Sequence, residues 1–193
     1  MELRMSRSRL QDLAFKYSSD KLFRHSYIPA YERLFDGMHV EKVLEIGVGY
    51  EQLMKPFLPD HVPFVRGSSL RMWSEYWPDA DIYACDVHVS ALVNEGRIRS
   101  YYADQSKRED LQQLMLKCDA YRQAFDVIID DGSHRHKDQV VSARELLSFV
   151  RPGGVYVIED VWADKGRELA MMFGGELVEG SRTGDDNLVV IRK

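Results

Sequence analysis

The sequence is poor in cysteine and has no long apolar run, and both shortages limit what the chain can be. Its 193 residues include two cysteines, Cys85 in an apolar run and Cys118 in a charged, helix-like stretch. They indicate neither a disulfide framework nor a cysteine metal site, so we predict two reduced structural thiols. No apolar stretch is long enough to cross a bilayer, and residues 1–17 alternate charged with apolar residues where a secretory signal is continuously apolar. We therefore expect a cytoplasmic protein with no membrane partner.

Basic residues are in the minority. The chain has 26 Lys and Arg against 31 Asp and Glu, a net charge of −5. Nucleic-acid binding needs a basic face, so the charge argues against a nucleic acid as the obligatory partner, although a local basic patch stays compatible with it. With 45% hydrophobic residues, the chain is suited to one globular domain with a self-sufficient core. We predict a single domain over 1–193, with a helical lead-in at 1–40 and the core at 41–193.

Short apolar segments alternate with amphipathic ones along the chain. Strand-length apolar runs lie at 42–47, 81–87, 97–103, 125–131, 153–160, 176–180 and 187–193, and helix-like stretches at 8–17, 27–35, 69–77, 107–123, 139–150 and 164–173. This alternation predicts an α/β fold with a mostly parallel sheet and helices on both faces. The last two strands are joined by a turn-like SRTGDD, which suits an antiparallel hairpin at one edge. Residues 50–67 contain three prolines and are predicted to form a long loop.

Acidic residues end several of the predicted strands. In an open parallel sheet the ligand site lies outside the carboxyl ends of the strands. The first strand ends in LEIGVG (44–49), where Glu45 precedes Gly47 and Gly49. Two glycines are weak support for a nucleotide site, because tight turns use glycine for steric reasons. A dinucleotide fingerprint needs a third glycine and an acid about 20 residues later, and the next strand-end acid here is Asp86, so NAD is disfavoured.

Two further strand ends are suited to a nucleoside. The Asp86 carboxylate can accept both hydroxyls of a ribose, and Asp104, beside Gln105 and Ser106, can accept an exocyclic amine of adenine. Each acid alone is more often a helix cap or a turn residue. Three acids in register at one edge of the sheet favour a ligand site.

The segment IIDDGSH (128–134) concentrates the chemistry. Asp131 or Ser133 alone would be explained as a cap of the following helix. The next strand, however, ends in Glu159 and Asp160, so three carboxylates are expected to converge, and a divalent cation would relieve their repulsion. Oxygen ligands favour Mg²⁺ first and Mn²⁺ next. His134 lies near enough to act as a general base.

Taken together, these motifs carry a resemblance. LEIGVG, GSSLRMW, DIYACD, ADQS, IIDDGSH and RPGGVYVIED, with SSDK and HSYIPAYERLF before them, resemble the class I S-adenosylmethionine-dependent methyltransferases, specifically the metal-dependent sugar O-methyltransferases of macrolide biosynthesis, over roughly residues 17–162. The resemblance implies a Rossmann-like, seven-stranded sheet. It implies metal ligands at Asp131, Glu159 and Asp160 and a base at His134, with Asp131 and His134 as the catalytic pair. The cofactor contacts that we infer are Glu45, Gly47, Ser68, Asp86, Asp104, Gln105 and Asp130.

The implied activity is transfer of a methyl group from S-adenosylmethionine to a hydroxyl of a small molecule. A sugar or a glycosylated natural product fits, because Mg²⁺ can chelate two neighbouring oxygens and acidify one of them. His134 would take the proton, and the protein would otherwise contribute positioning. A homo-oligomer is compatible with this interpretation, and the sequence does not decide it.

Other interpretations stay open. Cephalosporin-hydroxylase-like proteins share the DGSH and strand-end acid pattern, and a metabolite-binding subunit of the same fold could have lost its chemistry. A nicotinamide oxidoreductase and a nucleic-acid methylase are disfavoured by the glycine pattern and by the charge. In the lead-in, His25 could face the site, although a lone loop histidine is usually structural, and Tyr17, Lys21 and Tyr31 are candidates for its edge.

Overall fold

A seven-stranded sheet forms the centre of the molecule. The computed structural model describes residues 7–193, so the first six residues of the expected lead-in lie outside it. The strands are β1 (Lys42–Ile46), β2 (Asp81–Asp86), β3 (Ile98–Tyr102), β4 (Phe125–Asp130), β5 (Val150–Ile158), β6 (Glu176–Glu179) and β7 (Asn187–Arg192). Their order across the sheet is β3-β2-β1-β4-β5-β7-β6. The first five are parallel, and β7 is antiparallel to both β5 and β6. The α/β class, the parallel sheet and the C-terminal antiparallel hairpin are confirmed.

The strand order reverses beside β1, and this places the candidate site. From β1 the chain moves outward to β2 and β3, and then returns to add β4 on the other side of β1. Loops that leave β1 and β4 therefore diverge at one edge, which is where open α/β sheets bind ligands. Before these loops separate, backbone hydrogen bonds link the strand ends. Asp131 N donates to Ile46 O at 2.9 Å, and Gly47 N donates to Cys85 O at 2.8 Å.

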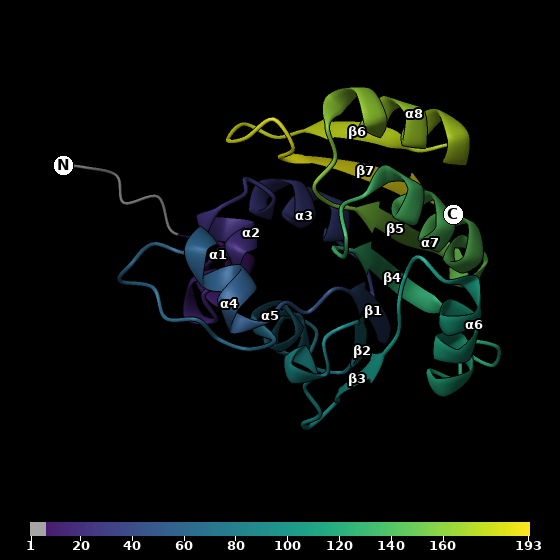
Figure 1. Cartoon of the computed structure of the whole chain (residues 1–193), viewed down its shortest axis with the longest axis horizontal. Coiled ribbons are helices and arrows are strands. Elements are labelled where there is room, and N and C mark those ends of the chain that lie inside the picture. Colours follow the sequence, from purple (N-terminus) through teal and green to yellow (C-terminus); the bar gives the residue numbers. More distant parts are fainter. Residues whose placement is uncertain (1–6) are drawn as a thin grey trace.

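Helices cover both faces of the sheet (Figure 1). The helices are α1 (Arg9–Lys16), α2 (Asp20–Phe23), α3 (Ile28–Phe35), α4 (Glu51–Met54), α5 (Ser68–Tyr76), α6 (Arg108–Lys117), α7 (His136–Leu146) and α8 (Ala163–Phe173), with 3₁₀ turns at Lys55–Phe57, Val89–Ala91 and Leu147–Phe149. Figure 1 shows α1, α2, α4 and α5 on one side of the sheet and α6 and α7 on the other. Among residues 7–193, no helix is long and apolar enough to cross a membrane.

Alternation along the strands produces two hydrophobic layers. Val127 and Ile129 of β4 pack with the N-terminal helices and α5, whereas Ile128 between them packs with α6, α7 and α8. Side chains of successive strand residues point to opposite faces, so a fully apolar strand fills both layers at once. The two cysteines are buried as free thiols in the second layer.

Several predicted segments differ from the structure. The helix expected at 139–150 is α7 followed by a 3₁₀ turn, and β5 begins at Val150, where that helix was expected to continue. The helix expected at 107–123 ends at Lys117, because Asp119 takes a left-handed conformation with φ of +51° that a continuing helix cannot contain. The loop expected at 50–67 contains helix α4 and a 3₁₀ turn that starts at Lys55. One-turn helices leave no room for a full apolar repeat, so the sequence pattern does not reveal them.

Candidate functional site

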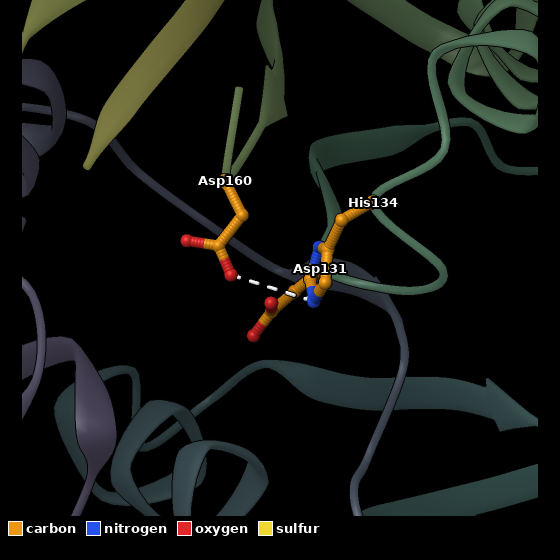
Figure 2. A group of neighbouring side chains, drawn as sticks. All are labelled: Asp131, His134 and Asp160. Carbon is orange, nitrogen blue, oxygen red and sulfur yellow. Dashed lines mark ion pairs between the residues drawn. The ribbon is translucent and has the colours of Figure 1, made fainter. Parts of the chain in front are cut away.

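Asp131, His134 and Asp160 meet at the carboxyl ends of β4 and β5. Their side chains point toward one another, and one ligand atom from each lies within 4.8 Å of the others (Figure 2). His134 Nε2 lies 3.4 Å from Asp160 Oδ2. His134 and Asp160 both have φ of +54°, a conformation that non-glycine residues rarely adopt. Strain of this kind concentrates at functional sites, where the surrounding structure holds it in place.

Beside this group, Lys21 of α2 lies among the other acids of the same edge. Its Nζ is 2.7 Å from Asp131 Oδ2, 2.7 Å and 2.8 Å from the two carboxylate oxygens of Glu159, and 3.3 Å from Glu45 Oε1. The Tyr31 hydroxyl also donates a hydrogen bond to Glu159. Burial opposes the charge on Lys21, but the carboxylates outweigh it and hold the pKa of the ammonium well above its ordinary value. Lys21 is therefore a buried cation.

Asp160 is held by a second set of side chains from the lead-in. The Tyr27 hydroxyl donates to Asp160 Oδ1 at 2.6 Å, and Asp160 N donates to the same hydroxyl oxygen at 3.1 Å. His25 stacks on Tyr27 with ring centroids 4.6 Å apart, and lies between Asp160 Oδ1, 3.3 Å from its Nε2, and Asp186 Oδ1, 3.2 Å from its Nδ1. These contacts occupy Asp160 Oδ1 and leave Oδ2 facing His134.

The donor set at this edge is suited to a hard divalent cation. Asp131 and Asp160 offer carboxylate oxygens close together, a placement that is repulsive without a cation between them. Glu159, the third predicted metal ligand, lies outside the group of three because its carboxylate is turned to Lys21 and Tyr31. His134, predicted as a base, offers a ring nitrogen within the group. The sequence-based metal set stays a prediction.

The predicted cofactor residues nearest β1 shape a glycine loop. Gly47 and Gly49 have φ of +89° and +75°, and Asp86 Oδ2 accepts hydrogen bonds from Val48 N at 2.9 Å and from Gly49 N at 3.1 Å. Asp86 Oδ1 accepts from His88 N at 2.7 Å. Each carboxylate oxygen can accept more than one hydrogen bond, so Asp86 fixes this loop and keeps capacity for a ligand hydroxyl.

Two more predicted cofactor residues flank that loop in the sequence: Glu45 precedes it, and Ser68 follows it at the start of α5. Glu45 is fully buried and accepts a hydrogen bond from Trp73 Nε1 at 2.9 Å. Burial raises the pKa of Glu45 to about 7, and Lys21 counteracts part of that rise. Ser68 is the first residue of α5, directly after Gly67, whose φ is +65°.

The remaining predicted cofactor residues form a network beneath the site. Gln105 Nε2 donates to Asp130 Oδ1 at 2.9 Å, and Gln105 Oε1 accepts from Ser133 N at 2.5 Å. Ser142 donates to Asp130 Oδ2. Asp104 is half-buried and accepts hydrogen bonds from the backbone and side chain of Ser106. Gln105 and Asp130 are thus bonded to each other and to protein groups, whereas Asp104 lies nearer the surface.

Asp130 provides a pH-dependent prediction. Burial raises its pKa to about 6, despite hydrogen bonds from Ser142 and Gln105. The folded state then binds a proton that the unfolded state releases near pH 4, so stability from this group is present at low pH and is lost as the pH rises through 6. Relative to Asp130→Asn, the wild type is expected to lose about 2 kcal/mol of unfolding free energy between pH 4 and 6.5. Urea denaturation across this range measures it.

The control for that measurement is Asp79→Asn at an exposed turn residue, which should keep the wild-type pH profile. Parallel profiles for wild type and Asp130→Asn would contradict the prediction.

Sequence reasoning placed the acids of the site better than the residues around them. Of the candidates from the lead-in, Lys21, His25 and Tyr31 contact site acids, whereas Tyr17 donates to Glu75 instead. Tyr27 and Asp186 were not anticipated. A signal that points to the role of Lys21 is the excess of acids, because several buried carboxylates need a buried cation, whereas that role was assigned from the sequence to a divalent ion.

Comparison with known proteins identifies relatives. No family model matches the chain. It is 38% identical over 157 residues to mycinamicin VI 2''-O-methyltransferase of Micromonospora griseorubida, covering 79% of this chain and 36% of that protein. It is 36% identical over 155 residues to 8-demethyl-8-alpha-L-rhamnosyl tetracenomycin-C 2'-O-methyltransferase of Streptomyces olivaceus, covering 79% of this chain and 37% of that protein.

A solved structure of a similar enzyme supports the relationship found by sequence. The MycE methyltransferase from the mycinamycin biosynthetic pathway, in complex with Mg, SAH and mycinamycin VI, superposes with a TM-score of 0.65 at 38% identity, covering 81% of this chain and 40% of that one. The chain therefore spans little more than a third of the length of the curated relatives it matches. Within that span, the chain has the class I methyltransferase fold and is a homologue of the macrolide and sugar O-methyltransferases.

Proposed function

We propose that this chain carries the catalytic site of an O-methyltransferase that uses S-adenosylmethionine and Mg²⁺ and acts on a hydroxyl of a sugar or glycosylated natural product. The observation that carries the proposal is the Asp131, His134 and Asp160 group at the carboxyl edge of the sheet, in a chain similar to enzymes with that named activity. A small hydroxylated substrate is the partner we propose. A cytoplasmic location and a homo-oligomer stay predictions.

Asp131 and Asp160 are the residues that we propose to hold the metal, with Glu159 as the predicted third ligand. Mg²⁺ at this place would supply Lewis acidity that lowers the pKa of a substrate hydroxyl. The Tyr27 hydroxyl donates to Asp160 Oδ1, and His25 Nε2 lies 3.3 Å from the same oxygen, so the orientation of Oδ2 is set before any ligand arrives. Fixed carboxylates of this kind reduce the reorganisation needed on binding.

His134 is the proposed proton acceptor. Its side chain is 41% exposed, and its Nε2 faces Asp160. An imidazole at the mouth of a carboxylate group can take a proton from a hydroxyl near neutral pH and pass it to water. The left-handed backbone at His134 turns the ring toward the group rather than into the following helix.

The proposed cofactor position lies over the glycine loop that Asp86 fixes. Apolar surface is exposed there, since Val87, directly after Asp86, is 45% accessible and Val89, two residues further on, is 70% accessible. A purine ring would cover such side chains, while the carboxylates of Asp86 and Asp104 are the proposed acceptors for hydroxyl and amine groups. Gly47 and Ser68 would border the same ligand, with Glu45, Gln105 and Asp130 behind them.

A methyl-transfer assay tests the proposal. Wild-type protein with labelled S-adenosylmethionine and rhamnosides that carry vicinal hydroxyls should transfer label, and EDTA should stop the transfer. His134→Gln is expected to lower kcat by about 10²–10⁴-fold, because general-base help is lost, while calorimetry should show unchanged cofactor binding. His39→Gln, at an exposed histidine paired with Glu41, is the matched control.

Two outcomes would contradict the proposal. A His134→Gln variant with wild-type kcat would remove the histidine from the mechanism. Failure of the wild type to bind S-adenosylmethionine, with and without Mg²⁺, would favour a metabolite-binding subunit of the same fold.

A further inference from the structure

We propose that Lys21 is a built-in counter-cation of the carboxylate edge, which lets the acids fold together without a metal and weakens their hold on a divalent ion by sharing Asp131 and Glu159 with it. The inference rests on the proposed metal position at Asp131 and Asp160. It concerns a residue of the lead-in and not one of the strand-end motifs.

The contacts of Lys21 are those of a cation at the centre of an anionic cluster. The side chain is fully buried, and its ammonium is in contact with Asp131, Glu159 and Glu45 at 2.7–3.3 Å. An ammonium removed from water is stable only when opposite charges and hydrogen bonds replace the solvent. Here Asp131 Oδ2 and both carboxylate oxygens of Glu159 accept hydrogen bonds from the ammonium, and Glu45 Oε1 forms an ion pair with it at 3.3 Å. Lys21 thus joins the ends of β1, β4 and β5 through one charge.

Asp131 is the residue that links Lys21 to the proposed metal group. Its Oδ2 accepts a hydrogen bond from Lys21, and its carboxylate also belongs to the group with His134 and Asp160. A divalent ion placed there must share the carboxylate with a fixed positive charge. The ammonium of Lys21 repels a divalent cation at this short distance, just as the carboxylates attract it. Lys21 therefore lowers the affinity of the site for the ion.

The charges at this edge indicate how much the removal of Lys21 should change the affinity for Mg²⁺. Glu45, Asp131, Glu159 and Asp160 are four of the carboxyl groups at this edge, and Lys21 brings one positive charge among them. Replacing Lys21 by Met keeps most of the side-chain volume and removes the charge. The edge then has one more negative charge at close range, which should strengthen Mg²⁺ binding by about tenfold or more and destabilise the metal-free fold.

The test is calorimetric titration of Mg²⁺ into the wild type and Lys21→Met at pH 8, together with melting temperatures with and without Mg²⁺. We expect the variant to bind Mg²⁺ about tenfold more tightly or better, to melt lower than the wild type without metal, and to recover more on adding it. Damage to the fold alone would weaken metal binding, so a gain in affinity separates an electrostatic role from a merely structural one.

Two further variants complete the design. The double variant Lys21→Met/Glu45→Gln restores the original net charge, and Gln can still accept from Trp73, so its Mg²⁺ affinity should return toward the wild-type value. Glu45→Gln alone keeps Lys21 and should weaken binding several-fold, which tests the idea even where Lys21→Met does not fold. Lys16→Met, at an exposed lysine paired with Glu75, is the matched control and should change nothing.

The outcomes distinguish this inference from the proposed function. If the wild type binds Mg²⁺ and Lys21→Met binds it equally or more weakly, the inference is overturned and the proposed metal site stands. If Lys21→Met alone binds, the inference holds and the proposed metal dependence of the wild type fails. If neither binds, both are overturned.

Discussion

Asp131→Asn is expected to weaken Mg²⁺ binding at least about 100-fold and to abolish metal-dependent methyl transfer. Asp131 supplies one of the two carboxylates of the proposed metal group, and a direct carboxylate-to-cation contact is worth several kcal/mol in a partly buried site. Asn is nearly isosteric and can still accept the hydrogen bond from Lys21, which keeps Glu159 as its partner. The fold should therefore survive, and calorimetric titration of Mg²⁺ measures the loss.

The matched control is Asp164→Asn, which removes one negative charge from an exposed position in the first turn of α8, four residues after Asp160. It should bind Mg²⁺ like the wild type. Undiminished binding by Asp131→Asn would exclude the strand-end group as the metal site, whatever the activity of the protein.

Gly47→Ala is expected to destabilise the protein by about 4 kcal/mol or more, a large share of the free energy of unfolding of a domain of this size. A Cβ at Gly47 would lie 1.9 Å from Asp131 O and 2.9 Å from Gly132 Cα, and both are backbone atoms that cannot move aside cheaply. The same backbone also has φ of +89°, which disfavours any L side chain. Urea denaturation followed by circular dichroism measures the change.

Gly37→Ala separates the two causes. Gly37 has φ of +70°, but a Cβ there would meet nothing within 4 Å, so only the backbone penalty of about 1–2 kcal/mol should appear. Equal losses in the two variants would show that the β1 and β4 loops do not approach as closely as described.

Much of the fold was predictable because its strands are short, apolar and separated by amphipathic helices. The run at 125–131 became β4, buried along its whole length, as expected for a central parallel strand. The end of the helix predicted at 107–123 was not predictable, since it depends on one left-handed residue, Asp119.

Some features of the candidate site were likewise predictable from the sequence, and others were not. By itself the sequence determined that acids end β1, β2, β4 and β5 and that parallel strands bring those ends to one edge, because topology follows from the alternation of strands and helices. Only the tertiary structure decided how the acids are used. It turned Glu159 to Lys21 and Tyr31, joined Asp130 to Gln105, and left Asp131 and Asp160 with His134. These partners come from segments distant in sequence, and a buried charge is paired by whatever the packing brings within reach, which no local pattern encodes.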